Sequence, residues 1–271
     1  MKHFAVIGNP IKDSLSPLMH NWIFRNLDLQ AKYNKIHVEK EDLPKVVKQL
    51  RDNVLCGINV TIPYKEKIMK FIDEINPRAQ SIGSVNCIMS KSDKLIGNNT
   101  DWYGFTKAIK INHIELHDKE VIVIGAGGVA KSILFSLKNF GVKKIILLNR
   151  TLQKARKLED DIVIAYSIDK IESLIKYDSI IINTTSIGMC TNQFPFEIGL
   201  INKSQFLIDI IYTPFETPFL KLGKKIGAKT LNGLDMFIFQ GLASLDLWFG
   251  EDISKQVNFI QIKSYLEAHI C

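Results

Sequence analysis

Apolar runs alternate with amphipathic segments of helical length along the whole chain. The apolar runs predict strands at 3–8, 32–38, 55–62, 85–90, 94–98, 120–124, 144–149, 162–166, 179–183, 205–210 and 228–231. Strands that alternate with helical patterns are typical of βαβ units, so the pattern predicts an α/β fold. No internal repeat, low-complexity tract or Pro/Gly/Ser-rich linker interrupts this alternation.

The pattern of predicted strands and helices changes near Asp101, where "NNTDWYGFTKAIK" places Asn, Thr and Asp ahead of a predicted helix. Such residues favour helix N-termini because their side chains accept hydrogen bonds from unpaired backbone N–H groups. We therefore expect two domains: residues 1–101, completed by C-terminal helices in 239–271, and residues 102–238. The stretch 232–250 is apolar around most of its circumference, which predicts a buried helix between the two lobes.

The composition is that of a soluble globular protein, with 46% hydrophobic and 23% charged residues among 271. No run approaches the roughly 18 apolar residues of a membrane span, and "FAVIG" near the start is too short for a signal peptide. The four cysteines, Cys56, Cys87, Cys190 and Cys271, form no CxxC pair, and the six histidines lack metal-ligand spacing. We expect no metal, no disulfide framework and a cytoplasmic location.

A formal net charge of +7 has two explanations. It favours an anionic ligand such as a nucleotide phosphate or a carboxylate, or it reflects a lysine-rich solvated surface. The lysines are spread along the chain and no arginine-rich or aromatic-interleaved block is present. Nucleic-acid binding is therefore not supported, and charge alone does not separate the other two explanations.

The most specific stretch is "EVIVIGAGGVAKSILFSLKNFGVKKIILLNRT", residues 120–151. An apolar strand is followed by the pattern G-x-G-x-x-A, a helix expected at 128–140, and a second strand. In this pattern Gly125 permits a tight turn, Gly127 lets the backbone approach a pyrophosphate, and Ala130 allows close packing of helix on strand. A glycine turn alone is weak evidence, but the order of the elements predicts a dinucleotide site. Its expected cofactor contacts are Gly125, Ala126, Gly127, Gly128, Val129 and Ala130.

The end of the second strand predicts NADP rather than NAD. An NAD site usually has an acid there for the ribose hydroxyls, whereas this chain has Asn149, Arg150 and Thr151, with Lys154 one turn later. A guanidinium and an ammonium attract the 2′-phosphate that an acid would repel. The alternative is that Arg150 and Lys154 are surface residues that open a helix.

A second polar loop, "INTTSIGM", follows another apolar strand. Ligands of doubly wound sheets bind at the carboxyl ends of strands, so Thr184 and Ser186 are expected near the ribose or nicotinamide. By itself the loop is equally typical of a Ser/Thr turn.

In the N-terminal half, "GINVTIPYKEKI" puts Asn59 and Thr61 on the face opposite Val60. Pro63 ends the strand and favours the first turn of a helix, with Lys65 two residues later. Half-buried strands also carry polar residues on their outer face, so this pattern leaves open whether the three polar side chains face solvent or a ligand.

"GNPIKDSLSPLMHN" supplies two serines. Ser16 is a predicted helix N-cap with Pro17 at the first helical position. Ser14 and Ser16 flank Leu15, so both hydroxyls could face one side of a loop and hold a carboxylate.

The motifs "SLSP", "NVTIPYK", "GSVN", "NNTD", "GAGGVAK", "NRT", "NTTSIGM" and "NGLDMFIFQ" occur in the order and spacing of the shikimate dehydrogenases. The resemblance runs from Val6 to Gln240. It implies an N-terminal α/β substrate-binding domain and a doubly wound, parallel-sheet Rossmann domain for NADP, separated by a cleft. The implied activity is the NADPH-dependent reduction of 3-dehydroshikimate to shikimate, a small-molecule reaction with no membrane partner, carried out by a monomer or homodimer.

The resemblance also implies roles for individual residues. Lys65 and Asp101 would form the catalytic pair, in which Lys65 donates a proton to the developing alkoxide. The substrate contacts would be Ser14 and Ser16 for the carboxylate and Asn59, Thr61, Asn86 and Gln240 for the ring hydroxyls. Gly233 of "NGLDM" is expected on the nicotinamide side. Tyr212 of "DIIYTP" either lines the cleft or is a core tyrosine at a strand end.

Three residues depart from the commonest family pattern: Trp102, Lys154 and Asp235. They affect the expected cofactor affinity and lobe closure but remove no catalytic group. Two alternatives are a relative that also oxidises quinate and a non-catalytic NADP-binding regulator. Those quinate relatives often carry an acid after the second Rossmann strand, which is missing here, and a regulator would tend to lose the proton donor. Another two-lobed Rossmann dehydrogenase would not explain "SLSP" and "NVTIPYK" together.

Overall fold

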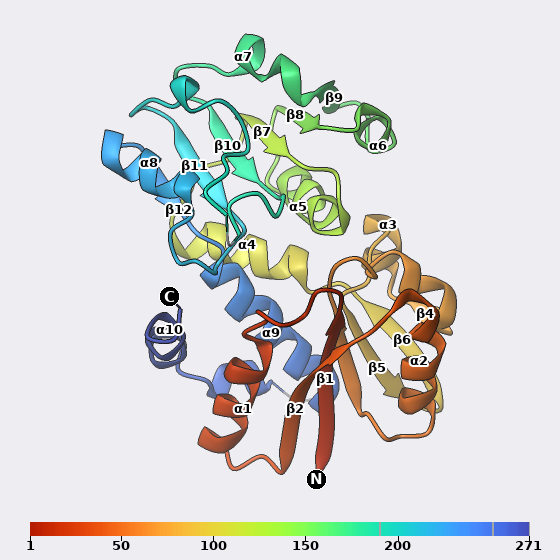
Figure 1. The fold of residues 1–271 in the computed structure, drawn as a ribbon. Helices are drawn as coiled ribbons and strands as arrows, with labels where there is room; N and C mark the ends of the chain where they lie inside the picture. Colours follow the sequence, from red (N-terminus) through yellow and green to blue (C-terminus); the bar gives the residue numbers. More distant parts are fainter. Residues whose placement is uncertain (190, 251, 271) are drawn as a thin grey trace. The chain divides into compact units, whose positions relative to one another are not determined.

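The computed structural model describes residues 1–189, 191–250 and 252–270, which form two compact units (Figure 1). Unit 1 comprises Met1–Phe105 and Ile238–His269, and unit 2 comprises Thr106–Phe237 together with Ile270. The expected divisions were 101/102 and 238/239. The observed ones fall inside two helices, α4 (Asp101–Ile111) and α9 (Leu234–Phe249), so each of these helices contributes residues to both units.

Unit 1 is built on a six-stranded mixed sheet with the strand order β2-β1-β3-β5-β6-β4. The strands are β1 (Lys2–Gly8), β2 (Ala31–His37), β3 (Gly57–Val60), β4 (Glu74–Ile75), β5 (Cys87–Lys91) and β6 (Lys94–Asn98). The helical segments are α1 (Ser16–Asn26), η1 (Lys40–Asp42), α2 (Leu43–Arg51), η2 (Lys67–Phe71), α3 (Pro77–Ile82), η5 (Ile253–Gln256) and α10 (Phe259–Glu267), where η marks a 3₁₀ helix. β1 pairs parallel to β2 and β3, whereas β5 runs antiparallel to β3 and β6.

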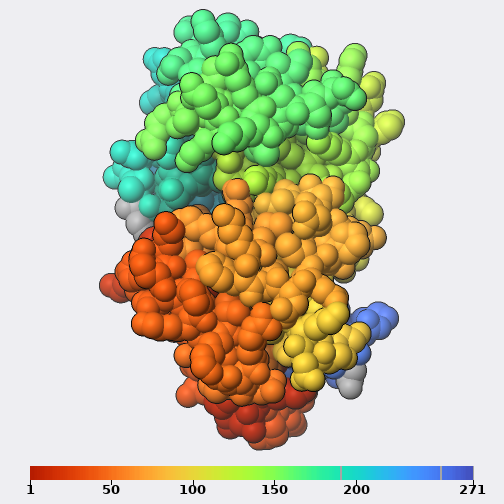
Figure 2. Space-filling view, turned by 90° about the vertical axis from the view of Figure 1, so that its right-hand side faces the viewer, coloured from red at the N-terminus to blue at the C-terminus, as the bar shows by residue number. Residues whose placement is uncertain are grey.

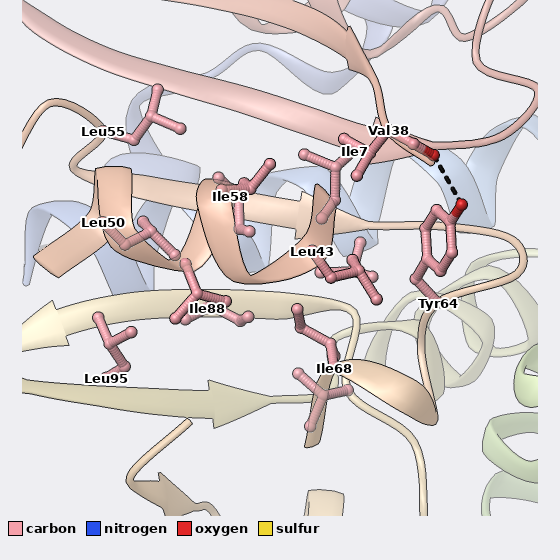
Figure 3. Packing of buried hydrophobic residues seen from close by; sticks show 14 of the residues in the cluster. Ile7, Val38, Leu43, Leu50, Leu55, Ile58, Tyr64, Ile68, Ile88 and Leu95 are labelled. Carbon is pink, nitrogen blue, oxygen red and sulfur yellow. Dashed lines mark hydrogen bonds between the residues drawn. The ribbon is translucent and has the colours of Figure 1, made fainter. Parts of the chain in front are cut away.

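One face of this sheet packs against α2 (Figure 3). Ile7 of β1 and Ile58 of β3 point to this face and belong to the same buried cluster as Leu43 of α2. The period of two in the strands and of about 3.6 in the helix brings one apolar face of each together. Tyr64 closes the cluster at one end, where its hydroxyl donates to Val38 O at 2.6 Å. The α2–α3 segment presents its outer surface in orange in Figure 2.

The other face of the same sheet packs against α1 and α9. Phe4 of β1 stacks on Trp248 of α9 with ring centroids 4.8 Å apart. Gly57 of β3 lies under the same indole, and a Cβ there would be 2.3 Å from Trp248 Nε1, so no larger residue fits. Both faces of the sheet are therefore covered, and Asn59, 6% exposed, lies in a buried layer rather than at solvent.

Two predictions for the segment after β3 are wrong. The strand expected at 55–62 ends at Val60, and no helix begins at Pro63. Thr61 O accepts a hydrogen bond from Tyr64 N at 2.9 Å, which closes a turn, and helical geometry begins only with η2 at Lys67. The two-residue strand β4 was not predicted, because two residues carry no periodicity.

Unit 2 is built on a six-stranded sheet in which every pair of neighbours is parallel, in the order β12-β11-β10-β7-β8-β9. Its strands are β7 (Glu120–Ile124), β8 (Lys144–Asn149), β9 (Val163–Ser167), β10 (Ile180–Asn183), β11 (Phe206–Asp209) and β12 (Lys229–Leu231). This is the doubly wound order of dinucleotide-binding domains, with the switch point between β7 and β10. The predicted Rossmann-type parallel sheet is confirmed.

The helical segments of unit 2 are α5 (Gly128–Asn139), α6 (Leu152–Arg156), η3 (Ile168–Lys170), α7 (Ile171–Leu174), η4 (Ile198–Leu200) and α8 (Pro218–Ile226). β10 is buried at every residue and β11 at every residue but Phe206, as expected for a parallel sheet covered on both faces. α5 begins directly after the carboxyl end of β7 and ends before Gly141, whose φ of +69° favours glycine. This places the glycine motif at the ligand-binding edge of the sheet.

Cys56 and Cys87 are free thiols, while Cys190 and Cys271 lie outside the described residues. Among the residues that the structure describes, no three His, Cys, Asp or Glu side chains gather into a potential metal site. None of the described helices is long and apolar enough to cross a membrane.

Candidate active site

A lysine–aspartate ion pair lies in unit 1. Lys65 Nζ donates to Asp101 Oδ2 at 2.6 Å, and the two side chains are 13% and 7% exposed. Lys65 follows the turn after β3, and its backbone oxygen accepts from Val85 N at 2.9 Å, just before β5. Asp101 opens α4. Two segments separated by 36 residues are thus brought to one point by the sheet.

Asn86 holds the other carboxylate oxygen of Asp101. Its Nδ2 donates to Asp101 Oδ1 at 2.8 Å, to Thr100 Oγ1 at 2.9 Å and, more weakly, to Gln240 Oε1 at 3.4 Å. Its Oδ1 accepts from Thr100 N at 2.6 Å. Two amide protons are shared among three acceptors, so Asn86 has capacity to exchange one of these partners for a ligand oxygen. Lys65, Asp101, Asn86 and Gln240 therefore lie together.

Asn59 is bonded within the protein at each polar atom. Its Oδ1 accepts from Tyr33 OH at 2.8 Å, and its Nδ2 donates to Asn86 O at 3.1 Å and to Ser244 Oγ at 2.9 Å. The alternation of β3 places Asn59 on the face opposite Val60, as the sequence predicted. On that face the amide joins β3 to the segment before β5 and to α9. Tyr33 and Ser244 were not identified from the sequence, where neither belongs to a motif.

Burial raises the pKa of the Cys87 thiol, beside Ser244, to about 12. The thiol therefore stays neutral and unreactive at physiological pH.

The two serines lie together at the start of α1. Ser14 Oγ donates to Ser16 Oγ at 3.2 Å and accepts from Ser16 N at 3.3 Å. The prediction that Ser16 is the N-cap is wrong: Ser16 is already the first helical residue, Leu15 occupies the N-cap, and Ser14 satisfies the backbone N–H instead. The expectation that both hydroxyls reach one side of the loop agrees with their contact. A pocket of about 380 Å³ opens beside Ser14, with Arg25 and Lys35 in its wall.

Thr61 directly follows β3, and Gln240 lies within α9. Thr61 is half-buried, and its methyl group packs over Gly8, where a Cβ would be 2.4 Å from Thr61 Cγ2. The backbone N–H of Thr61 donates to Ile7 O at 2.9 Å, which extends the β1–β3 pairing by one bond. Gln240 O accepts from Ser244 Oγ at 2.9 Å, so the network around Asn59 and the side chain of Gln240 share α9.

The glycine motif of unit 2 fits a pyrophosphate. Gly125 has φ of +109° and a Cβ there would be 2.5 Å from Thr184 Oγ1, so this position requires glycine. Gly127 differs: no described atom lies within 4 Å of a Cβ placed there, so its backbone faces open space. No side chain caps the N-terminus of α5, which leaves N–H groups and the positive end of the helix dipole for an anion. Ala126, Gly128 and Val129 are partly exposed and Ala130 is buried.

The cationic residues after β8 are accessible. Arg150, Thr151 and Lys154 are exposed, and within the described part of the chain no carboxylate pairs with either cation. Asn149 Nδ2 donates to Thr151 O at 2.8 Å, which shapes the turn that presents Arg150. The chemistry of this corner fits a phosphate group.

The polar loop after β10 contacts the glycine turn. Thr184 Oγ1 donates to Ile124 O at 2.7 Å, while Ser186 is exposed. Gly233 lies against the segment after β11: a Cβ there would be 1.9 Å from Ile210 O, so backbone packing already requires glycine. The Tyr212 ring lies 4.3 Å from that of Phe237, centroid to centroid, and is half-buried. Thr184 thus lies beside the glycine turn. Position 233 requires glycine because of backbone packing, whether or not a ligand binds there.

Known protein families are similar to this chain in both units. Residues 6–88 match the shikimate dehydrogenase substrate binding domain, and residues 107–213 match shikimate / quinate 5-dehydrogenase. The chain is 43% identical over 256 residues to the shikimate dehydrogenase (NADP(+)) of Bacillus cereus, covering 91% of this chain and 92% of that one. Among solved structures, shikimate dehydrogenase from Aquifex aeolicus has a TM-score of 0.89 at 35% identity, covering 98% of this chain and 97% of that one.

The Thermus thermophilus enzyme in complex with NADP(H) and shikimate has a TM-score of 0.84 at 32% identity, with 98% of both chains covered. Both domain matches, the curated relative and the solved structures agree with the arrangement of the motifs. The chain belongs to the shikimate dehydrogenase family.

Proposed function

We propose that this protein is an NADP-dependent shikimate dehydrogenase that reversibly reduces 3-dehydroshikimate to shikimate. The observation that carries the proposal is the Lys65–Asp101 pair, 2.6 Å apart and bonded to Asn86 in a partly buried site. The named activity of the relatives at 40–43% identity supports the same reaction.

Lys65 is proposed as the proton donor. When bound, the nicotinamide supplies the hydride to the carbonyl carbon. The ammonium stabilises the negative charge that develops on the carbonyl oxygen and then transfers its proton to it. Because the side chain is only 13% exposed, this charge acts where water screens it little.

Asp101 and its neighbours are proposed to orient the lysine and the substrate. Asp101 Oδ2 aims the ammonium, while Oδ1 is held by Asn86. A substrate hydroxyl would replace one of the weaker partners of Asn86, for which the 3.4 Å contact with Gln240 is the first candidate. Thr61 and Asn59 would complete the polar wall, with Asn59 acting mainly through the segments that it joins.

The substrate carboxylate is proposed to bind Ser14 and Ser16, whose hydroxyls lie 3.2 Å apart. On the cofactor side, Arg150 and Lys154 would contact the 2′-phosphate, and the N-terminus of α5 would contact the pyrophosphate. Gly125–Ala130, Asn149, Thr151, Thr184, Ser186 and Gly233 form the proposed remainder of that site, and Tyr212 is a proposed substrate contact.

A four-way assay tests the reaction: shikimate and quinate, each with NADP⁺ and with NAD⁺, followed at the absorbance band of the reduced cofactor. We expect turnover of shikimate with NADP⁺ to be at least about tenfold more efficient than with NAD⁺, because NAD⁺ lacks the phosphate contacts, and to be more efficient than turnover of quinate with either cofactor. Faster turnover of quinate would assign the chain to the quinate-oxidising branch. No turnover with either substrate, together with tight NADP⁺ binding, would favour a non-catalytic regulator.

The proposed setting is the cytoplasm, where the protein would act as a monomer or homodimer on small molecules. The absence of a CxxC pair from the sequence is compatible with a reducing compartment. Sedimentation at micromolar concentration would measure the oligomeric state.

A further inference from the structure

A buried carboxylate to which the sequence analysis gave no role lies at the carboxyl edge of the unit 2 sheet. Asp209 is the last residue of β11 and is 0% exposed. It pairs across the sheet with Asn183, the last residue of β10, which is also 0% exposed. Asp209 Oδ1 accepts from Asn183 Nδ2 and from Ile211 N, both at 3.1 Å, and Oδ2 accepts from Thr217 Oγ1 at 2.8 Å. We name Asn183, Asp209 and Thr217 the carboxylate clasp.

The clasp joins the two loops that follow β10 and β11. On the β10 side, Asn183 Oδ1 accepts from Thr185 N and Oγ1, at 3.1 and 2.7 Å, and its Nδ2 donates to Ile187 O at 3.2 Å. On the β11 side, Thr217 caps α8 by accepting from Leu220 N at 3.4 Å. The amide of Asn183 therefore shapes the 184–188 loop while it is bonded to Asp209.

The clasp supports three residues of the proposed cofactor site. Thr184 and Ser186 belong to the loop that Asn183 shapes. Gly233 N donates to Ile211 O at 3.0 Å, and the N–H of the same Ile211 donates to Asp209. Gly233 is therefore connected to the carboxylate through Ile211. The three donors that bond to the carboxylate are Asn183, Ile211 and Thr217 rather than these residues.

We propose that Asp209 is a positioning residue for the cofactor: in its ionised form it holds the loops after β10 and β11 in the binding-competent arrangement. This inference rests on the proposed NADP site. All three donors point at the carboxylate, so the ionised form satisfies each of them. A proton on Asp209 would face the Thr217 hydroxyl, which would then have to accept and would leave its own hydrogen unpaired in a fully buried position.

Burial raises the pKa of Asp209 to about 6, against the opposing effect of Ile211 N, Thr217 and Asn183. The described groups responsible for the shift are neutral, and no charged side chain is among them. The carboxylate therefore becomes protonated in mild acid, and the loops after β10 and β11 then lose the binding-competent arrangement.

Binding of NADP⁺ to the full-length protein, measured by isothermal titration calorimetry from pH 5 to pH 8, tests this. Asp209→Asn is nearly isosteric and imitates the protonated form. The 2′-phosphate of the cofactor itself titrates near pH 6. The quantity to follow is therefore the ratio of the variant Kd to the parent Kd, in which that contribution cancels. We expect a ratio of about ten at pH 8, for the loss of one bond to a charged acceptor, falling to about one at pH 5.

Asp178→Asn is the matched control, because Asp178 is exposed and precedes the opposite end of β10. Its ratio should be about one at every pH. Thr217→Val keeps the shape of the side chain but removes a donor that favours the ionised form of Asp209, so the pKa of Asp209 should rise in this variant. The ratio of the Thr217→Val Kd to the parent Kd should therefore change at a pH above 6. Far-ultraviolet circular dichroism at each pH verifies folding, and if Asp209→Asn does not fold, the Thr217→Val profile decides.

A pH-independent ratio for Asp209→Asn, or a Thr217→Val ratio that does not change with pH, would overturn the inference. A parent protein that does not bind NADP⁺ at any pH would instead refute the proposed function, so the two failures are distinct.

Discussion

Replacement of Lys65 by alanine should lower kcat about 10³–10⁴-fold and change KM for the substrate by less than about threefold. A positioned general acid contributes about 10²–10⁴ in rate, and loss of a donor that stabilises an oxyanion costs about 10²–10³. The two effects come from one ammonium and overlap, so multiplying the two rate factors would overestimate the loss of kcat. The expected loss corresponds to about 4–5.5 kcal/mol of transition-state stabilisation. KM changes little because the proposed substrate contacts Ser14, Ser16, Asn86 and Gln240 remain.

The same change should also destabilise the fold. Breaking a buried ion pair costs about 3–5 kcal/mol because one charge is left unpaired. Here the loss should be smaller, about 2–3 kcal/mol, since Asp101 keeps its 2.8 Å bond from Asn86 and Lys65 is 13% exposed. Adding Asp101→Asn should recover most of this free energy of unfolding, because the amide removes the unpaired charge.

The assay is steady-state reduction of 3-dehydroshikimate with NADPH, combined with urea unfolding of the parent, both single variants and the double variant. Lys70→Ala is the control, since Lys70 is an exposed lysine of η2 near in sequence; it should behave as the parent. If the pair acts as a unit, the double variant loses no more activity than Lys65→Ala alone. A Lys65→Ala enzyme within about tenfold of the parent kcat, or losses that multiply in the double variant, would refute the reasoning.

Three further predictions follow from other parts of the chain. Arg150→Ala should raise KM for NADPH about tenfold and leave that for NADH unchanged, because only the first carries the 2′-phosphate; equal effects on both would contradict the assignment. Gly233→Ala should abolish soluble expression or lower the melting temperature strongly, because its Cβ would lie 1.9 Å from Ile210 O; a parent-like melting curve would contradict this. His20 is fully buried, its ring nitrogens have no hydrogen-bond partner among the described residues, and burial lowers its pKa to about 3. Between pH 6.5 and 3 the unfolded state therefore binds more protons at His20, so the contribution of His20 to the free energy of unfolding should decrease as the pH is lowered, by about 2 kcal/mol between pH 6.5 and 5. Asp209, whose pKa is raised to about 6, has the opposite effect in both proteins, so the loss should appear in the free energy of unfolding of the parent relative to His20→Phe, both measured by urea unfolding. A difference that does not change with pH would exclude His20 as the cause.

Local features of the chain were predictable because each is written in consecutive residues. The strand at 144–149 was predicted to the residue, and α5 differs from its predicted 128–140 by one residue at its end. The G-x-G-x-x-A pattern predicts which edge of the sheet binds the ligand, because the strand, the turn and the helix that form this edge are consecutive in the chain. The pattern of strands and helices predicted the α/β class, and the family resemblance implied the doubly wound sheet, which is one of the few topologies that parallel pairing with short connections allows.

The turn after β3 was not predictable in the same way. Pro63 is compatible both with a helix N-terminus and with a turn, and local preference does not separate them. Ser16 was likewise a reasonable N-cap by residue type, yet Leu15 occupies the N-cap, and the preceding loop brings the Ser14 hydroxyl to Ser16 N.

The sequence by itself determined the α/β class, the family motifs and the residue types of the site. Only the tertiary structure decided that Asn59 is hydrogen-bonded to Tyr33 and Ser244, and that Asp209 is buried and hydrogen-bonded to Asn183 and Thr217. These partners are 8 to 185 residues apart in the chain. Whether a polar side chain faces water, a ligand or another residue depends on which elements cover it, and a pattern of consecutive residues carries no record of that.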